Sequence, residues 1–142
     1  SSPRPSVSRY ATSRMNRLSL LGLVFIFLGG GLGSLLRYLL GVGFSYLVPA
    51  SRGAFGWGTL LVNVLGSCLI GYFVERYHSE LGLVRLLLVV GFCGGFTTFS
   101  TFTMEVYTLF TEGLSWLALL YIVGSILLSL GALYLGLRLA GA

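Results

Sequence analysis

Neutral hydrogen-bonding side chains recur at helical spacing in two apolar stretches of this sequence. Thr59 and Asn63 lie four residues apart in "GTLLVNVLGS", and Tyr121, Ser125 and Ser129 recur every four residues in "YIVGSILLS". Residues at this spacing share one face of a helix. Because an unpaired polar group in an apolar environment costs several kcal/mol, these groups either bond to neighbouring helices or line a path for a ligand or an ion.

The segment "GFCGGFTTFSTF", residues 91–102, combines glycines, hydroxyls and aromatic rings. Gly94 and Gly95 have weak helix propensity, and the hydroxyls that follow can bond freed backbone groups. We therefore predict a break in a helix without proline. Unwound carbonyls at such a break can coordinate a cation, whereas the amino end of the resumed helix attracts an anion.

A helix that resumes near Thr98 places Thr98, Thr101 and Glu105 on one flank, with Phe102 beside them. The edge of a phenyl ring is electropositive, so the rings of Phe99 and Phe102 can contact a small anion where water is excluded. With the amide and hydroxyl donors, these rings favour an anion pathway. A carboxyl group at Glu105 would there be protonated or bonded to neighbouring hydroxyls.

Arg37, in "GGGLGSLLRYLL", permits two interpretations of equal weight. Its guanidinium group either reaches the membrane interface or faces a vestibule and attracts anions. The sequence contains no nucleophile and base pair, phosphate-binding loop or nucleic-acid signature. We expect neither an enzyme nor a partner of nucleic acids.

The elements that position these residues must be membrane helices. Of the 142 residues, 56% are hydrophobic and only 9% are charged, too few polar groups to cover a water-soluble fold. Each apolar stretch is near the roughly 20 residues that span a bilayer. The predicted fold is an all-α membrane protein with four spans, the third broken, running from about Leu18 to Leu40, Trp57 to Val74, Leu83 to Phe102 and Leu114 to Leu139.

Residues 1–17 are polar and Arg-rich, and we predict that they form a disordered basic tail before a channel domain of residues 18–142. Four spans put both termini on one side of the membrane. The basic residues on that side outnumber Arg37 and Arg52 on the other, which predicts cytoplasmic termini. The larger set is Arg4, Arg9, Arg14, Arg17, Arg76, Arg85 and Arg138.

Pairs of small residues four apart occur in every predicted span. Such pairs let helix backbones approach closely, either within one chain or between subunits. Taken one at a time they indicate packing inside the chain, and taken together they favour an oligomer. The pairs are Gly29 with Gly33, Ser67 with Gly71, Gly91 with Gly95, and Ala132 with Gly136.

The motifs together resemble the CrcB/Fluc family of fluoride channels over nearly the whole chain after residue 17. The similarity lies in "GGGLGSLLRY", "GTLLVNVLGS", "GFCGGFTTFSTFTMEV" and the hydroxyl track of the last span. The resemblance implies an antiparallel dimer with two anion pathways and a central sodium ion, bound by the main-chain carbonyls of Gly94 and Thr97. It further implies that Asn63 donates to fluoride, that Phe99 and Phe102 face it, and that Thr101, Glu105, Tyr121 and Ser125 form the polar track.

One feature departs from the family pattern. Members that insert in both orientations are expected to show little arginine asymmetry, yet this chain is biased. Either a homodimer of dual topology tolerates the bias, or the partner is a second, oppositely oriented homologous chain.

The resemblance implies passive export of cytoplasmic fluoride across the plasma membrane, the bacterial inner membrane. The alternative is a small four-span dimeric exporter of drug-like cations. That class needs an acidic residue deep in an early span, and the first acidic residue here is Glu75, at the end of the second span.

Overall fold

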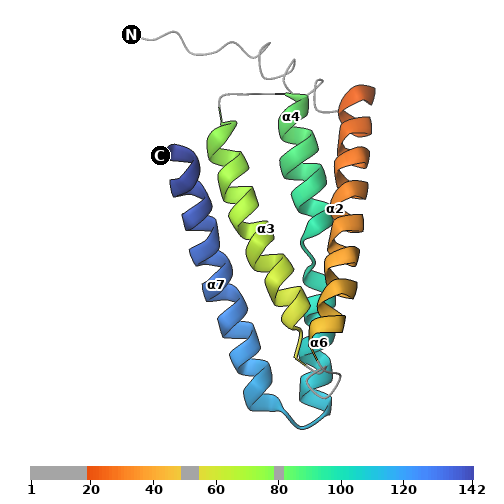
Figure 1. Ribbon diagram of the computed structural model, residues 1–142, viewed down its shortest axis with the longest axis vertical. Helices are drawn as coiled ribbons and strands as arrows, with labels where there is room; N and C mark the ends of the chain where they lie inside the picture. The colour runs from red at the N-terminus through yellow and green to blue at the C-terminus, as the bar shows by residue number, and fades with distance from the viewer. Residues whose placement is uncertain (1–18, 49–54, 79–81) are drawn as a thin grey trace, which may run out of the picture.

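A computed structural model describes residues 19–48, 55–78 and 82–142 of the chain, and every regular element in those ranges is a helix (Figure 1). Four helical segments are long and apolar enough to cross a membrane, as predicted. The predicted tail of residues 1–17 lies outside the described residues. The elements are α2 (Leu20–Leu47), α3 (Trp57–Arg76), α4 (Leu83–Arg85), η2 (Leu86–Cys93), α5 (Gly94–Phe96), α6 (Phe99–Thr111) and α7 (Ser115–Gly141).

The third span is the most irregular one, and it is built from four helical segments, which are α4, η2, α5 and α6. It runs from Leu83 to Thr111, nine residues beyond the end predicted at Phe102, because α6 continues after the break. Its η2 segment is a π-helix, which the sequence pattern did not predict. Helices of this kind are rare and often occur at functional sites.

The chain reverses between α6 and α7 in a tight turn. Gly113 has φ 76°, and the N–H of Leu114 donates to the Leu109 carbonyl at 2.9 Å. The N–H of Gly113 donates to the Phe110 carbonyl at 3.2 Å, which completes a Schellman motif. Leu114 also packs against the buried cluster around Leu109. The turn therefore joins α6 and α7 into one hairpin.

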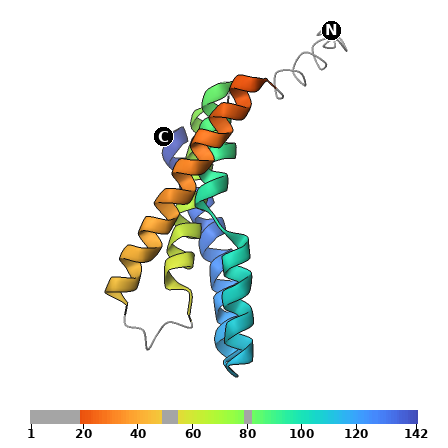
Figure 2. The ribbon, with the colours of Figure 1, turned by 90° about the vertical axis from the view of Figure 1, so that its right-hand side faces the viewer.

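The helices pack as two layers that are linked by the third span (Figure 1, Figure 2). The first half of the third span lies along α2, and α3 lies along α7. After the break, α6 packs against α7 instead. Figure 2 shows that the end of α2 and the end of α6 diverge from each other.

Glycines allow the close contact of α2 with the third span and that of α3 with α7. A Cβ at Gly33 would overlap the Phe92 carbonyl oxygen and would lie 2.8 Å from the Phe96 nitrogen, and one at Gly95 would overlap the Gly30 carbonyl oxygen. A Cβ at Gly136 would likewise overlap the Cys68 carbonyl oxygen. The predicted small-residue pairs therefore meet one another within the chain, Gly29 and Gly33 with Gly91 and Gly95, and Gly71 with the α7 backbone near Gly136. Contacts within one chain explain why these small-residue pairs occur in each span, so the pairs alone do not support an oligomer.

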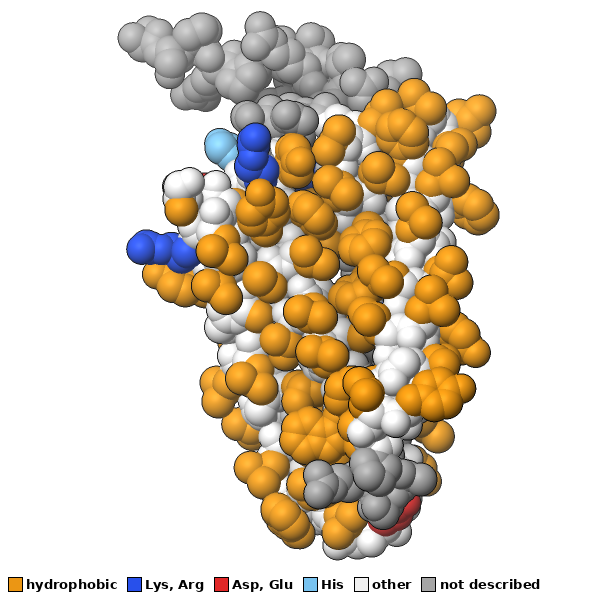
Figure 3. Space-filling view, viewed as in Figure 1, with side chains coloured by type: hydrophobic (Ala, Val, Ile, Leu, Met, Phe, Trp, Pro, Cys, Tyr) orange, Lys and Arg blue, Asp and Glu red, His pale blue; other side chains and the backbone are white. Residues whose placement is uncertain are grey.

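The face of the bundle that Figure 3 shows is apolar over most of its length. Large side chains such as Leu20, Phe27 and Leu127 are more than 60% exposed. This surface suits the hydrocarbon region of a bilayer. The arginines of the described ends, Arg76 and Arg138, lie near one end of the bundle, beside the tyrosines Tyr77 and Tyr134.

The contact between α2 and the third span yields a stability prediction. Gly33→Ala should lower the free energy of unfolding by about 1–3 kcal/mol, because the added methyl group overlaps backbone atoms that cannot rotate away. Thermal unfolding in detergent micelles measures the change. Gly31→Ala is the matched control, since a Cβ there meets no atom of the chain within 4 Å. Equal melting temperatures for the two variants would contradict the close contact.

Candidate functional site

The break in the third span lies at two threonines. Thr97 has φ −81° and ψ 155°, and Thr98 has φ −146° and ψ 115°, both in the extended region. Gly94 and Gly95 remain helical, so the break lies in the second part of the predicted segment 94–100, and the helix resumes just after Thr98 as predicted. Gly95 is instead needed for contact with α2. One hydroxyl bonds a freed backbone group as predicted, since Thr98 Oγ1 accepts from the Thr101 N–H at 3.3 Å. Thr97 Oγ1 donates at 2.9 Å to the Cys93 carbonyl, which also accepts from the Thr97 N–H.

Asn63 of α3 holds the backbone of the break through two hydrogen bonds. Its Nδ2 donates to the Thr98 carbonyl at 3.1 Å, and the Thr98 N–H donates to its Oδ1 at 2.9 Å. The amide thereby satisfies both backbone groups of one non-helical residue. Since a primary amide has two N–H donors, one N–H of Asn63 is left for another acceptor.

This exchange of partners frees two carbonyls of the third span. In a continuous helix the Thr98 N–H would bond to Gly94, and the Thr101 N–H would bond to Thr97. The Thr98 N–H donates to Asn63, and the Thr101 N–H donates to Thr98 Oγ1 at 3.3 Å. Neutral carbonyl oxygens without such partners are suitable ligands for a hard cation. Sodium binding by the carbonyls of Gly94 and Thr97 stays a prediction.

Arg37 lies at the break in the third span. Its Nε donates to the Gly95 carbonyl at 3.2 Å, and Ser34 donates to the same oxygen at 3.4 Å. The Arg37 side chain therefore turns toward the break and lines a cavity there. α2 continues beyond Arg37 to Leu47, so this arginine lies ten residues before the end of its helix.

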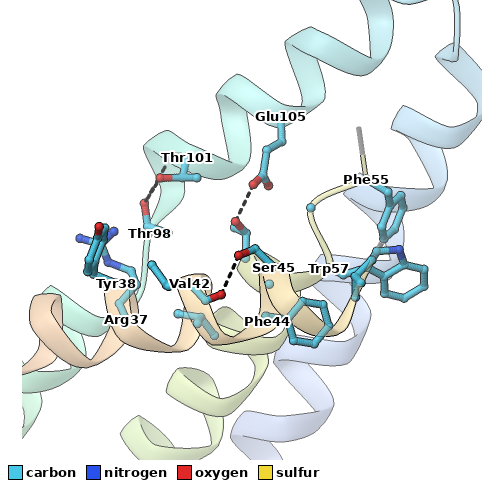
Figure 4. A pocket seen from close by; sticks show the side chains of 16 residues that line it. Arg37, Tyr38, Val42, Phe44, Ser45, Phe55, Trp57, Thr98, Thr101 and Glu105 are labelled. Carbon is cyan, nitrogen blue, oxygen red and sulfur yellow. Dashed lines mark hydrogen bonds between the residues drawn. The ribbon is translucent and has the colours of Figure 1, made fainter. Parts of the chain in front are cut away.

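Hydroxyl groups continue from the break along α6. Thr98 is the N-cap residue of this helix, and its hydroxyl donates to Thr101 Oγ1 at 3.0 Å (Figure 4). Both threonines are on the flank predicted from helical geometry. Thr101 also lines the cavity that contains Arg37. The amino end of α6 therefore presents hydroxyls to that cavity, next to the helix end that favours negative charge.

One turn further along α6, two hydroxyls bind the carboxyl group of Glu105. Thr59 Oγ1 donates to one oxygen at 2.6 Å, and Tyr121 OH lies 2.5 Å from the other. These bonds join the second, third and fourth spans. They match the expectation that Glu105 bonds to neighbouring hydroxyls. Thr59 and Asn63 both contact the third span, as their shared face predicts.

Aromatic rings form a row beside these polar groups. The ring centroids of Phe99 and Phe102 are 5.7 Å apart, and those of Phe102 and Tyr121 are 5.1 Å apart. Tyr121 is 1% exposed, whereas Phe99 is 78% exposed. The row therefore extends from the inside of the bundle to its surface.

The hydroxyl track of α7 is only partly matched by hydrogen bonds. Tyr121 bonds to Glu105, as described above. Ser125 is buried, and its hydroxyl has no hydrogen-bond partner within the described ranges. Ser129, a turn further on, is half-buried. An unpaired buried hydroxyl calls for a partner, and a transported ion is one such partner.

An open cavity of about 600 Å³ collects the charged and polar groups of the site (Figure 4). It lies between the second half of α2, the start of α3 and the first turns of α6. Arg37, Thr98, Thr101 and Glu105 line it together with the aromatic side chains of Tyr38, Phe44, Phe55 and Trp57. Asn63, Ser125 and Ser129 are not part of its lining.

Three residues of the site were not singled out from the sequence. Ser34 shares the Gly95 carbonyl with Arg37, and the Gly56 carbonyl lies 3.3 Å from Tyr121 OH. Phe55 packs on Tyr121 with ring centroids 4.8 Å apart. Spacing could have indicated only Ser34, which lies one turn before Arg37. Phe55 and Gly56 precede α3 and carry no periodic signal.

The fold and the site define a class of protein. A bundle of membrane-spanning helices has a broken helix at its centre, freed carbonyls on one side of the break and neutral donors with aromatic rings on the other. Such a site can exchange the hydration shell of an ion for protein dipoles. The geometry is that of a membrane protein that conducts ions.

Comparison with known proteins identifies the family within this class. Residues 24–137 match the family described as CrcB-like protein, Camphor Resistance (CrcB), and the chain belongs to it. The protein named fluoride-specific ion channel FluC from Nitrobacter winogradskyi is 46% identical over 115 residues, which cover 78% of this chain and 88% of the relative. The FluC protein of Rhizobium meliloti is 41% identical over 131 residues, which cover 90% and 98%. That of Phocaeicola vulgatus is 45% identical over 118 residues, which cover 81% and 94%.

The hydrogen bonds at the break yield a second stability prediction. Asn63→Ala should lower the free energy of unfolding by about 1–3 kcal/mol, because both backbone groups of Thr98 lose their partner in an apolar environment. Ser67→Ala, on the same helix, is the control. Its hydroxyl bonds only to the backbone of its own helix, at the Asn63 carbonyl, so the loss should stay below about 1 kcal/mol. Similar losses in detergent unfolding experiments would refute a special role for Asn63.

Proposed function

We propose that this protein is a fluoride-selective channel through which cytoplasmic fluoride leaves the cell passively. The observation that carries the proposal is the track of neutral donors and aromatic rings beside the broken helix, in a chain whose relatives are named fluoride-specific ion channels. Export of the ion would protect the cytoplasm and give fluoride resistance. The names of these relatives give no support to the alternative exporter of drug-like cations.

Selectivity follows from the chemistry of the groups on this track. Fluoride is small and strongly hydrated, so its water must be replaced by donors that lie close together. The free N–H of Asn63 and the hydroxyls of Thr101, Tyr121 and Ser125 provide neutral donors, and the ring edges of Phe99 and Phe102 add weak electropositive contacts. Each contact is weak enough to permit release, which a fixed positive charge on the track would hinder.

The carboxyl group of Glu105 competes with fluoride for hydroxyl donors of the pathway. Its carboxyl oxygens accept from Thr59 and Tyr121. A fluoride ion that reaches either hydroxyl competes with the carboxylate for the same hydrogen. The two hydroxyls therefore need not lose a bond when the ion arrives, because they exchange one acceptor for another.

The membrane potential supplies the driving force. An elementary charge gains about 2.3 kcal/mol per 100 mV, which corresponds to a concentration ratio of roughly fifty. A potential that is negative inside therefore drives fluoride outward through an open pathway. Arg37 at the cavity attracts the anion without lying on the donor track itself.

The proposal includes an antiparallel dimer. The exposed face of α6 bears Phe99, Ser100 and Thr101 at the depth of the membrane, and the cavity beside it is open on one side. Hydroxyls and a vestibule of this kind do not suit contact with lipid tails. A second, inverted subunit would cover them. That subunit is either the same chain in the opposite orientation or a homologous chain, and the bias of the arginines leaves both open.

A sodium ion between the subunits would use the main-chain carbonyls of Gly94 and Thr97. Two such carbonyls from each subunit supply four oxygen ligands. When bound, the ion supplies positive charge that holds the two breaks together.

Cysteine labelling of intact cells should find the termini of partner subunits on opposite sides of the membrane. Fluoride flux should fall when sodium is removed during purification. Labelling from one side alone would exclude the antiparallel arrangement, and unchanged flux would exclude the ion.

Fluoride efflux from liposomes tests the function itself. Purified protein should release fluoride rapidly when valinomycin balances the charge with potassium, and it should retain chloride in the same liposomes. A cation exporter would release neither anion. Failure of fluoride to leave liposomes that contain folded, reconstituted protein would refute the proposed function.

Phe102→Ile tests the role of the ring edges in the same assay. Isoleucine keeps an apolar side chain of similar reach but removes the electropositive edge, so flux should fall about tenfold, the equivalent of about 1.4 kcal/mol. Phe27→Ile, on the exposed surface of α2, is the control and should conduct normally. If Phe102→Ile conducts as well as the control, this ring contributes only packing.

A further inference from the structure

The ring of Tyr121 is held between two phenylalanines. The centroids of Phe102 and Tyr121 are 5.1 Å apart, and those of Phe55 and Tyr121 are 4.8 Å apart. The rings are tilted by 51° and 56° to the tyrosine ring, arrangements that aromatic pairs favour. Phe55 in turn packs on Trp57, with centroids 4.5 Å apart. Phe55 therefore connects the start of α3 to a buried side chain of α7.

The same segment of chain contacts the hydroxyl end of Tyr121. The Gly56 carbonyl lies 3.3 Å from Tyr121 OH, and the shorter contact of that hydroxyl is with Glu105, at 2.5 Å. Thr59, one turn later, donates to the other oxygen of Glu105. The residues just before α3 and its first turn thus contact the ring of Tyr121, its hydroxyl and its carboxyl partner.

The direction of a tyrosine hydroxyl is set by the plane and position of its ring, because the oxygen is fixed to the ring. The bond to Glu105 at 2.5 Å permits little displacement. Tyr121 comes from α7 and Glu105 from α6, and Phe102 is on the same helix as Glu105. Phe55 lies just before α3 and contacts the Tyr121 ring from outside the α6–α7 hairpin, so it adds a restraint on that ring that the hairpin does not supply.

We propose that Phe55 is a positioning residue of the ion pathway, which aims the Tyr121 hydroxyl at the point where Glu105 and a passing fluoride ion compete for its hydrogen. The inference rests on the proposed function. Phe55 acts through Tyr121 and is not itself assigned a contact with fluoride. A leucine at this position would fill much of the space but would not hold the tyrosine ring at one tilt.

A double-mutant cycle distinguishes positioning from packing. Tyr121→Phe removes the hydroxyl and keeps the ring, so the packing of Phe55 on that ring is retained. Phe55→Leu should lower fluoride flux about tenfold in the wild-type background and less than about twofold in the Tyr121→Phe background, since there is no hydroxyl left to aim. An equal loss in both backgrounds would overturn the proposal, because the ring contact alone would then explain the effect.

Two further variants complete the design. Phe55→Tyr keeps an aromatic ring and should retain at least about half of the wild-type flux. Phe73→Leu alters another contact between aromatic rings, with Tyr77 at 6.4 Å near the other end of α3, and should conduct normally. Loss of flux in Phe73→Leu as large as in Phe55→Leu would contradict a specific role for Phe55.

A spectroscopic readout is independent of conduction. With 3-fluorotyrosine incorporated at position 121, the ¹⁹F resonance should shift or broaden in Phe55→Leu and stay unchanged in Phe73→Leu. The spectrum tests the positioning of Tyr121 even if Tyr121→Phe conducts too slowly for the effect of Phe55→Leu on its flux to be measured. It also tests the positioning if the wild-type protein fails to conduct fluoride, which would show that the proposed function itself is wrong. An unchanged resonance in Phe55→Leu would show that Phe55 does not position the tyrosine.

Discussion

The requirement that backbone groups be paired inside a membrane governs this structure. A helix that breaks in hydrocarbon exposes amides and carbonyls that water cannot reach. Here the Asn63 amide takes both backbone groups of Thr98, and the Thr98 hydroxyl caps the resumed helix. The same bonds draw amides away from the carbonyls of Gly94 and Thr97. Asn63 thus pairs the backbone of the break and the Thr98 hydroxyl caps α6, so the chemistry on both sides of the break depends on these two residues.

Close glycine contacts fix where the break lies relative to the rest of the bundle. The glycines of α2 let the first half of the third span approach within backbone contact, and this brings the Gly95 carbonyl to Arg37 and Ser34. On the other layer, contact between α3 and α7 sets the distance between Thr59 and Tyr121, so that both hydroxyls reach one carboxyl group. The polar pathway is therefore assembled at the junction of two separately packed layers.

Sequence periodicity predicted the helices and much of the site because both obey the spacing of a helix. Thr59 with Asn63, and Thr101 with Glu105, were placed correctly on their faces. The break was predicted correctly within residues 94–100, but propensity could not reveal that Gly95 stays helical to contact Gly30 and that the two extended residues are Thr97 and Thr98. The π-helix and the contacts of Phe55 and Gly56 also escaped prediction, because they arise from tertiary packing that no local pattern encodes. The contact of Arg37 with the Gly95 carbonyl also arises from tertiary packing and could not be predicted from the sequence.

The tight turn at Gly113 has a mechanical consequence. Because α6 and α7 are joined by a Schellman motif, and α7 packs along α3, these three helices form one packed unit. The second unit is α2 with the first half of the third span, which glycine contacts hold together. The only covalent link between the units in the third span is Thr97–Thr98, so a change in their angle is taken up by the dihedral angles of two residues. A rotation at these two residues would alter the carbonyls on one side of the break and the hydroxyls on the other at the same time.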